Sequence, residues 1–168
     1  MLFTVLGPVA TTVRGHTHLL PRSQRRAVLG YLLLNANRVV SQEAVVAALW
    51  ADTPPPSARN QIHAGVSVVR AHLGSLGHRN ALVRSQAGYQ LSVEPDELDL
   101  LMFEDCLRRA RSIAAGGQPA TAAGLFRAGL ELWSGPALGG AAAAYVASAR
   151  THFDEQRLGA IQDLLAQE

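Results

Sequence analysis

Short apolar runs separated by turn residues open the chain. Residues 2–6, 9–13 and 17–20 are rich in large apolar and β-branched side chains, and Gly7-Pro8 and Arg14-Gly15 stand between them. Runs of this length between Gly and Pro residues are typical of strands joined by tight turns. The pattern predicts a small antiparallel N-terminal sheet of two or three strands.

The pattern then changes to helical spacing. Apolar side chains recur on one side of residues 23–35, and Ser23 is a candidate N-cap. A second helical segment begins behind Ser41, another candidate N-cap, and runs to Trp50. These features predict two short helices, with the extended dipeptide Val39-Val40 between them.

A third helix follows a clear break in the pattern. Pro54-Pro55-Pro56 prevents the second helix from continuing, and Ser57 then offers an N-cap for the next one. The apolar residues of this third helix recur at helical spacing, as Ile62, Val66, Val69 and Leu73. Beyond a loop at residues 74–80, two short apolar runs flank Ser85-Gln86-Ala87-Gly88 and predict a hairpin.

The second half of the chain has a different pattern. Residues 98–114, 119–133 and about 140–166 are alanine-rich helical segments, separated by Gly116-Gly117 and Ser134-Gly135-Pro136. Helix pairs with small residues at their contacts are typical of tetratricopeptide-like arrays. This half is therefore predicted to be all helical.

The order of elements in the first half is that of a winged helix-turn-helix. In that fold the third helix lies in the DNA major groove, and the hairpin reaches the flanking backbone or minor groove. The predicted fold class is mainly α with small β-sheets. It consists of a winged helix-turn-helix DNA-binding domain over residues 1–93, followed by an all-α, tetratricopeptide-like helical domain over residues 97–168.

Side chains suited to contact bases lie opposite the apolar side of the third helix. Asn and Arg side chains pair with adenine and guanine edges, and a Ser hydroxyl contacts either a base or a phosphate. The predicted major-groove residues are Arg59, Asn60, His63, Ser67 and Arg70.

Charge divides the chain at the same place as the pattern. Residues 1–93 carry nine arginines against two carboxylates, a net charge of +7, whereas residues 94–168 carry six against eleven, a net charge of −5. This asymmetry favours a polyanion-binding first half. Arg22, Arg25 and Arg38, near the first two helices, and Arg84 in the hairpin are the predicted phosphate contacts.

Other kinds of chemistry have little support in the sequence. Cys106 is the single cysteine, and no His or Cys cluster has metal-ligand spacing, so we predict neither a metal nor a cofactor. We find no nucleophile and base pair, which argues against an enzyme. No run of about 18 apolar residues is present, so we predict no membrane partner and a cytoplasmic, nucleoid-associated protein.

Several short segments along nearly the whole chain form a specific combination. They are residues 36–41, 48–50 and 55–60, the pattern Val66-Ser67 with Arg70 and Leu73, Gly88-Tyr89, residues 94–99 and residues 132–138. Together they resemble the Streptomyces antibiotic regulatory protein (SARP) family. The last segment is similar to the opening of that family's bacterial transcriptional activation domain.

The resemblance implies both a fold and a function. The fold is an OmpR/PhoB-type winged helix followed by a tetratricopeptide-like activation domain, which in the family runs beyond residue 168, so residues 97–168 are expected to be incomplete. The function is binding of double-stranded DNA at direct repeats upstream of biosynthetic promoters, with recruitment of RNA polymerase. By the same resemblance Trp50 and Tyr89 approach the DNA backbone, although Trp50 equally fits a role in the core.

The sequence also departs from the family pattern in its recognition elements. Val68 and Ala71 stand where the family has further basic residues, and Gly65 in mid-helix costs roughly 1 kcal/mol relative to alanine. In the hairpin, Arg84 precedes Ser85, where the family has its arginine. Because a shift by one residue on a strand changes the face presented, the hairpin contact is expected to differ from that of the family.

The resulting hypothesis is a sequence-specific transcriptional activator of a biosynthetic, secondary-metabolite gene cluster. A single winged helix with few contacts binds weakly at physiological salt, so we expect a homodimer on repeated DNA sites. Two alternatives stay open. One is a helical protein-interaction scaffold with weak DNA binding, and the other is a regulator that senses a small ligand in its helical half.

Overall fold

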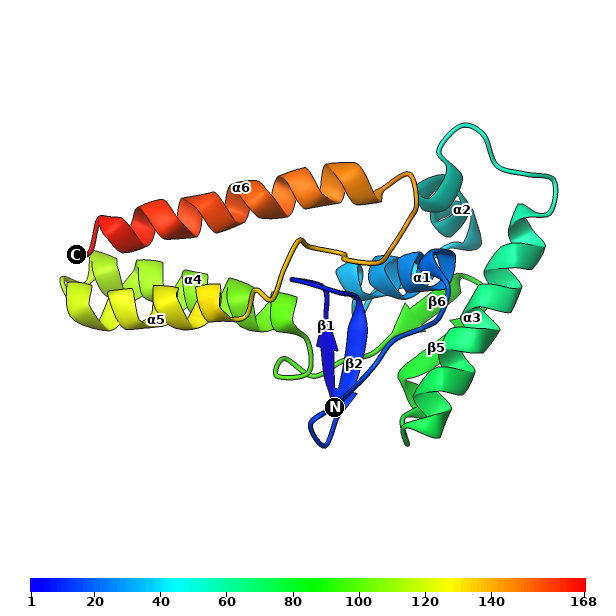
Figure 1. The fold of residues 1–168 in the computed structure, drawn as a ribbon, viewed down its shortest axis with the longest axis horizontal. Coiled ribbons are helices and arrows are strands. Elements are labelled where there is room, and N and C mark those ends of the chain that lie inside the picture. The colour runs from blue at the N-terminus through cyan, green and yellow to red at the C-terminus, as the bar shows by residue number, and fades with distance from the viewer.

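The computed structural model describes residues 1–168 and has two parts joined side by side (Figure 1). The first part contains β1 (Leu2–Thr4), β2 (Ala10–Val13), β3 (His16–His18), α1 (Ser23–Leu34), β4 (Val39–Val40), α2 (Gln42–Trp50), α3 (Ala58–Ser75), the 3-10 turn Arg79–Ala81, β5 (Leu82–Ser85) and β6 (Gly88–Leu91). The second part contains α4 (Asp99–Ala115), α5 (Pro119–Glu131) and α6 (Val146–Leu165). This order confirms the predicted fold class.

Two small antiparallel sheets frame the first part. The N-terminal sheet has the order β1-β2-β3, as predicted, and the second sheet has the order β4-β6-β5. In the hairpin, Arg84 lies opposite Tyr89, and Gly88 has a φ of 140°. A Cβ atom on Gly88 would lie 1.9 Å from the Val40 carbonyl oxygen, so this position admits only glycine. The glycine therefore allows β6 to pass close to β4.

The three helices of the first part begin largely where the sequence predicts. Ser41 caps α2 as expected, since its Oγ accepts a hydrogen bond from the Ala44 N–H at 3.0 Å. The predicted cap of α1 is wrong, because Ser23 lies inside the helix and Arg22 is its N-cap. Ser57 is the N-cap residue of α3 as predicted, but its Oγ accepts a hydrogen bond from the Gln61 side chain instead of a backbone N–H.

Helix α3 packs on α1 through the predicted apolar stripe. Ile62, Val66, Val69 and Leu73 are all buried. Gly65 also faces α1, and a Cβ atom placed on it would lie 3.4 Å from Cγ2 of Val28. The mid-helix glycine thus marks a close approach of the two helices.

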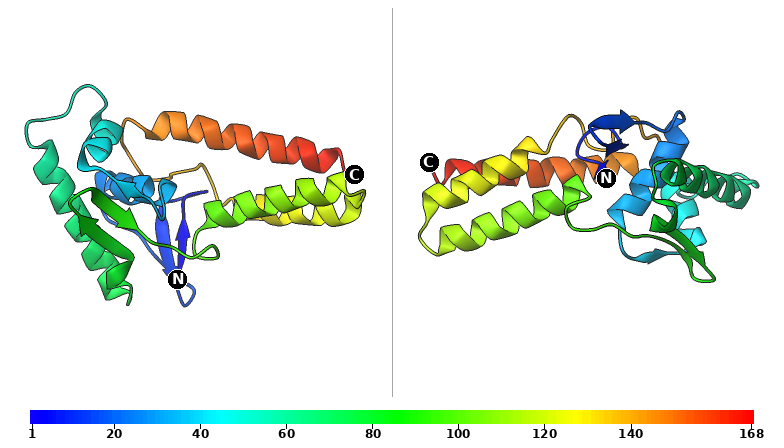
Figure 2. Two further views of the ribbon diagram at one scale, coloured as in Figure 1. Left: turned by 180° about the vertical axis from the view of Figure 1, so that it is seen from behind. Right: turned by 90° about the horizontal axis from the view of Figure 1, so that it is seen from below.

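The second part is a helical layer. Helices α4 and α5 form an antiparallel pair, and α6 packs against α5 (Figures 1 and 2). Helix α6 starts at Val146 and not near residue 140, because residues 134–145 form an irregular crossing segment of turns and bends that we call the strap. The strap runs from α5 across the first part and back to α6.

A buried carboxylate joins the two parts. Asp99, at the start of α4, is only 1% exposed. Its carboxylate accepts backbone N–H groups from Val5 at 2.9 Å, Leu6 at 2.9 Å and Leu100 at 2.8 Å. Burial raises the pKa of Asp99 to about 6, although these donors act to lower it. We call residues 5–9, Asp99 and the strap together the seam.

The hydrophobic core is continuous through both parts. One cluster of 35 buried residues runs from the N-terminal sheet to α6. The division into domains at residues 1–93 and 97–168 therefore stays a prediction. No helix combines the length and hydropathy needed to cross a bilayer.

Candidate nucleic-acid interface

The outer surface of α3 presents a narrow stripe of small and hydrogen-bonding side chains. Asn60, Ala64, Ser67 and Ala71 are exposed and follow one another at helical spacing. They lie opposite the buried stripe, so the packing of α3 on α1 fixes their direction. The predicted direction of Asn60 and Ser67 is therefore confirmed, whereas their contact with bases stays a prediction.

Arginines from α1 flank this stripe on one side. Arg22, at the N-cap of α1, and Arg25, in its first turn, line a shallow hollow of about 200 Å³ together with Gln61 and Ala64 of α3. The N-terminus of α1 thus lies beside the N-terminal half of α3. The structure brings these two predicted phosphate contacts to the expected surface.

Two further arginines flank the C-terminal half of the stripe. Arg70 and Arg79 line a hollow of about 290 Å³ with Ser67 and Ala71. The Arg70 Nε donates to the Leu82 carbonyl oxygen at 3.2 Å, which leaves its terminal nitrogens free of the hairpin backbone. Arg70 therefore ties the hairpin to α3 and still reaches the exposed surface.

Arg79 was missed by the sequence analysis. It lies in the predicted loop at residues 74–80, where no periodic pattern indicates which way a side chain points. In the structure the chain turns back after α3, and the Arg79 Nε would lie 3.4 Å from a Cβ atom placed on Gly74. Because Gly74 has no side chain, Arg79 can lie across the end of α3. Gly74 is therefore the one residue in the sequence that bears on the position of Arg79.

The N-terminus of α2 and the hairpin border the stripe from the remaining side. Arg84 is exposed and lines a small hollow with Gln42 and Glu43. Arg59 pairs with Glu43 at 3.2 Å, and the two side chains are 70% and 67% exposed. Because so exposed a pair contributes little energy, Arg59 is free to exchange Glu43 for a phosphate or a base.

Two predicted contact residues, His63 and Tyr89, hydrogen-bond to each other. Tyr89 is only 2% exposed, and its hydroxyl shares a hydrogen bond with Nδ1 of His63 at 3.2 Å. The second nitrogen of His63 accepts from the Gln42 side chain at 3.1 Å. With both ring nitrogens engaged, His63 joins α3 to α2 and the hairpin. Its contact with bases stays a prediction. Tyr89 is thus buried behind His63, and its predicted approach to the DNA backbone stays untested.

Arg38 and Trp50 lie away from the other predicted residues. Arg38 follows the C-terminal end of α1 and lies near Glu104 of α4, where burial raises the pKa of the Glu104 carboxyl and the charge of Arg38 acts against that shift. Trp50, at the end of α2, is half-buried against the core. The structure thus favours the core role of Trp50 and places Arg38 beside the helical part.

The distribution of ion pairs separates the two parts. Among side chains of residues 1–93, the pair of Arg59 with Glu43 is the single ion pair. In the helical part the arginines at 108, 109, 111 and 127 all pair with carboxylates. The positive charge around α3 is therefore largely uncompensated, as a surface that attracts polyanions requires.

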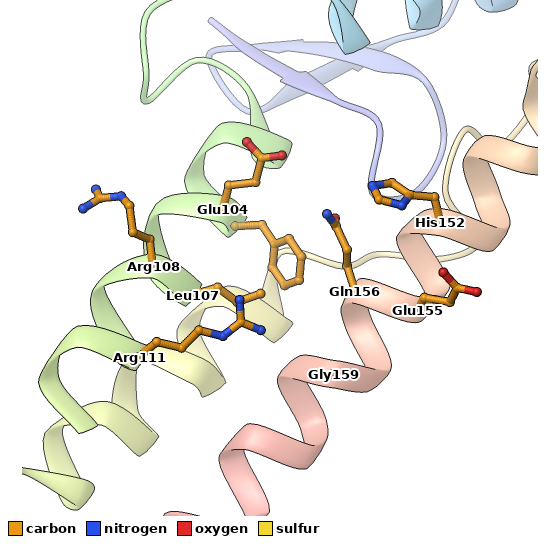
Figure 3. Close-up of a pocket in the computed structure, with 9 residues that line it drawn as sticks. Glu104, Leu107, Arg108, Arg111, His152, Glu155, Gln156 and Gly159 are labelled. Carbon is orange, nitrogen blue, oxygen red and sulfur yellow. The ribbon is translucent and has the colours of Figure 1, made fainter. Parts of the chain in front are cut away.

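A second candidate site lies in the helical part. A groove of about 590 Å³ separates α4 from α6 (Figure 3). Glu104 of α4 faces His152 and Gln156 of α6 at one end, and Arg111 lies further along. Burial raises the pKa of the Glu104 carboxyl, although His152 opposes this shift. The groove has a mixed polar lining over the buried Phe103 and Leu107. No group of three or more His, Cys, Asp or Glu side chains in the chain is placed to hold a metal ion.

Comparisons with known proteins cover both parts. Residues 98–168 match the family described as the bacterial transcriptional activator domain. The transcriptional regulatory protein MoaR1 of Mycobacterium tuberculosis is 35% identical over 140 residues, which are 82% of this chain and 45% of that protein. The regulatory protein AfsR of Streptomyces griseus is 35% identical over 157 residues, 93% of this chain and 16% of that protein.

A solved structure extends the likeness to the fold. The structure of Mycobacterium tuberculosis EmbR in complex with a low affinity phosphopeptide superposes with a TM-score of 0.92 at 32% identity. The match covers 99% of this chain and 45% of the EmbR chain. The chain spans about half or less of the length of the curated relatives it matches.

Proposed function

Because the chain belongs to the Streptomyces antibiotic regulatory protein family of transcriptional regulators, we propose that it is a sequence-specific DNA-binding transcriptional activator. The observation that carries this proposal is the exposed stripe of α3, flanked by arginines from α1, from the hairpin and from the turn after α3. Such a face combines short side chains that approach base edges with cations that meet the phosphates on either side.

The two kinds of contact are assigned to different residues. Asn60, Ser67 and Arg70, with Arg59 at the start of α3, read base edges in the major groove. Arg22, Arg25, Arg79 and Arg84 contact phosphates and fix the register of α3 on the duplex. The assignment is supported by exposure and position, since each of these side chains reaches the surface around α3.

The number of contacts sets the expected mode of binding. One module of this kind buries a small surface, and specific affinities near 10⁻⁸ M require more contacts than about four arginines on phosphates and about four side chains on bases provide. We therefore propose that two copies bind adjacent direct repeats as a homodimer on DNA. Each copy reads one repeat with its own α3.

The helical part is proposed to carry the second half of the activity. Its net negative charge argues against contact with DNA and favours a protein partner, for which RNA polymerase at a biosynthetic promoter is the candidate. The groove between α4 and α6 supports a second candidate function, the binding of a partner segment or a small ligand. Both functions place the protein in the cytoplasm with the chromosome.

Fluorescence anisotropy tests the main proposal. The purified chain is titrated with a labelled duplex from its own upstream region and with a random duplex of equal length, at about 50 and 200 mM salt. We expect binding to both at low salt, with a strong preference for the upstream duplex that persists at high salt. A companion variant carries glutamine in place of Arg22, Arg25 and Arg84, which removes three positive charges from the flanks of α3. Absence of binding to either duplex at low salt would contradict the proposal and favour the scaffold function.

A further inference from the structure

The strap crosses the DNA-binding part before the chain enters α6. It runs alongside the loop that follows β1, where Leu138 donates its N–H to the Val5 carbonyl oxygen at 2.8 Å and Gly139 donates to Gly7 at 2.9 Å (Figures 1 and 2). Val9 donates in return to the Gly139 carbonyl oxygen at 2.9 Å. The strap is therefore held against this loop by backbone hydrogen bonds and is not a free linker.

The end of the strap caps α2. The last carbonyl groups of a helix have no partner within that helix. Ala144 donates its N–H to the Leu49 carbonyl oxygen at 3.1 Å, and Tyr145 donates to Ala48 at 3.0 Å. The helical part thus supplies the hydrogen bonds that finish the second helix of the helix-turn-helix.

The Tyr145 side chain continues from there into α1. Its hydroxyl donates to the Ala27 carbonyl oxygen at 2.6 Å, and its ring meets the Tyr31 ring edge-on with centroids 5.3 Å apart. Gly30 forms a notch for it, since a Cβ atom there would lie 2.8 Å from the hydroxyl oxygen. Burial raises the pKa of Tyr145, so the phenol stays a hydrogen-bond donor throughout the neutral range.

We infer that Tyr145 is a positioning residue for DNA recognition, through which the helical part fixes α1 and α2 against α3. This inference rests on the proposed function. Tyr145 bonds to Ala27, two residues beyond the phosphate-contacting Arg25, and its backbone caps the helix that packs on α3. Helix α6 begins at the next residue and carries one wall of the groove.

The physical role of such a residue is preorganisation. If α1 and α2 move more in the free protein, part of the binding energy is used to order them. The observed affinity is then the intrinsic affinity multiplied by the fraction of molecules in the binding-competent state. Once the complex has formed, its contacts with phosphates are the same. The affinity for specific DNA is therefore lowered, whereas its salt dependence is unchanged.

The test is the substitution Tyr145→Phe, which removes the hydroxyl and keeps the ring. We expect the affinity for the upstream duplex to fall about three- to tenfold, as for one lost hydrogen bond, with an unchanged slope against salt and a smaller loss on random DNA. Amide hydrogen exchange of the free protein is expected to rise in α1 and α2. Tyr31→Phe is the matched control, because it removes a hydroxyl from the adjoining ring and leaves the bond to Ala27 in place.

A second variant separates positioning from a general loss of stability. Gly30→Ala raises helix propensity but fills the notch, so it is expected to displace the Tyr145 hydroxyl and weaken DNA binding in the same way. In the double variant with Gly30→Ala and Tyr145→Phe, the losses of DNA-binding free energy are expected to be less than additive. Both variants are compared at a temperature where circular dichroism shows them fully folded.

The outcomes distinguish the inference from the function on which it rests. A wild-type protein that binds no duplex overturns both. A wild-type protein that binds the upstream duplex, with Tyr145→Phe equal to it in affinity and in exchange, overturns the inference alone. Equal losses for Tyr145→Phe and Tyr31→Phe also overturn it, because they would show that the bond to Ala27 has no special role.

Discussion

The exposed stripe of α3, which we call the face, and the seam differ in how their polar groups are satisfied. On the face, Asn60 and Ser67 are exposed, and the one ion pair nearby lies in solvent. In the seam, the Asp99 carboxylate accepts three backbone N–H groups, and backbone hydrogen bonds link the strap to residues 5–9. Groups that water already satisfies are free to exchange partners, whereas buried groups are costly to leave unpaired. The face is therefore suited to binding and the seam to holding it in place.

This contrast predicts that substitutions in the seam act on stability and those on the face act on DNA binding. The largest effect is expected for Asp99→Ala, which leaves buried N–H donors of Val5 and Leu6 without an acceptor. We expect the free energy of unfolding to fall by about 2–4 kcal/mol, measured by urea denaturation. Asp105→Ala on the same helix is the control, because its pair with Arg108 is exposed and contributes little. Equal losses for the two variants would contradict the assigned role of the seam.

The comparison also explains what the sequence could predict. The stripe of α3 follows from local periodicity, because the buried positions of a helix determine which side chains face away. The strands and the hairpin likewise follow from short apolar runs and turn residues. Gly65 appears in the sequence only as a cost in helix propensity, whereas the structure shows that it marks the close approach of α1 and α3.

The seam could not be predicted in the same way. Asp99 bonds to residues more than ninety positions away in sequence, and the segment at 134–145 has no periodicity that shows what it crosses. The hydrogen bond between His63 and Tyr89 could not be predicted for a related reason. Residue type and helical position suggest contact with DNA, but the side chains satisfy one another across α3 and the hairpin.

The second prediction concerns base recognition on the face. Arg70→Ala is expected to reduce the preference for the upstream duplex over random DNA by about 1–3 kcal/mol, because a bidentate arginine contact to guanine carries that much discrimination. Since the Arg70 Nε also bonds to the Leu82 carbonyl oxygen, unfolding is measured in parallel to detect a loosened hairpin. Arg70→Lys keeps the charge without the fork of nitrogens. Full recovery of the preference in Arg70→Lys would show that only charge matters at this position.

The third prediction concerns phosphate contact beside the face. Arg25→Ala is expected to weaken binding to upstream and random DNA equally and to reduce the slope of log affinity against log salt by about one. The free energy of unfolding should change little, because the Arg25 side chain lines the surface hollow beside α3 and lies outside the seam. Arg127→Ala, in the helical part, is the matched control and should leave the slope unchanged. A selective loss on the upstream duplex would instead assign Arg25 to base recognition.

The fourth prediction concerns the pH dependence of stability, where the smallest effect is expected. It arises at a half-buried contact between the N-terminal sheet and α3. Thr11 Oγ1 and His72 Nε2 share a hydrogen bond at 2.9 Å, and burial together with the nearby His18 lowers the pKa of His72 below 6.5. The unfolded chain then takes up the proton more readily than the native protein. The stabilisation from this contact is present above about pH 6.5 and is lost as the pH falls.

The pH dependence due to His72 has to be measured as a difference between the wild type and a His72 variant, because Asp99 changes the stability with pH in the opposite direction. Its pKa is raised to about 6, so protonation of Asp99 at lower pH favours the native protein. His72→Gln keeps a hydrogen-bonding partner for Thr11 but does not titrate. Between about pH 7.5 and pH 5.5, the thermal midpoint of the wild type should fall relative to that of His72→Gln. A constant difference between the two midpoints would show that His72 titrates as it does in the unfolded chain. The contact would then belong with the solvated face and not with the buried seam.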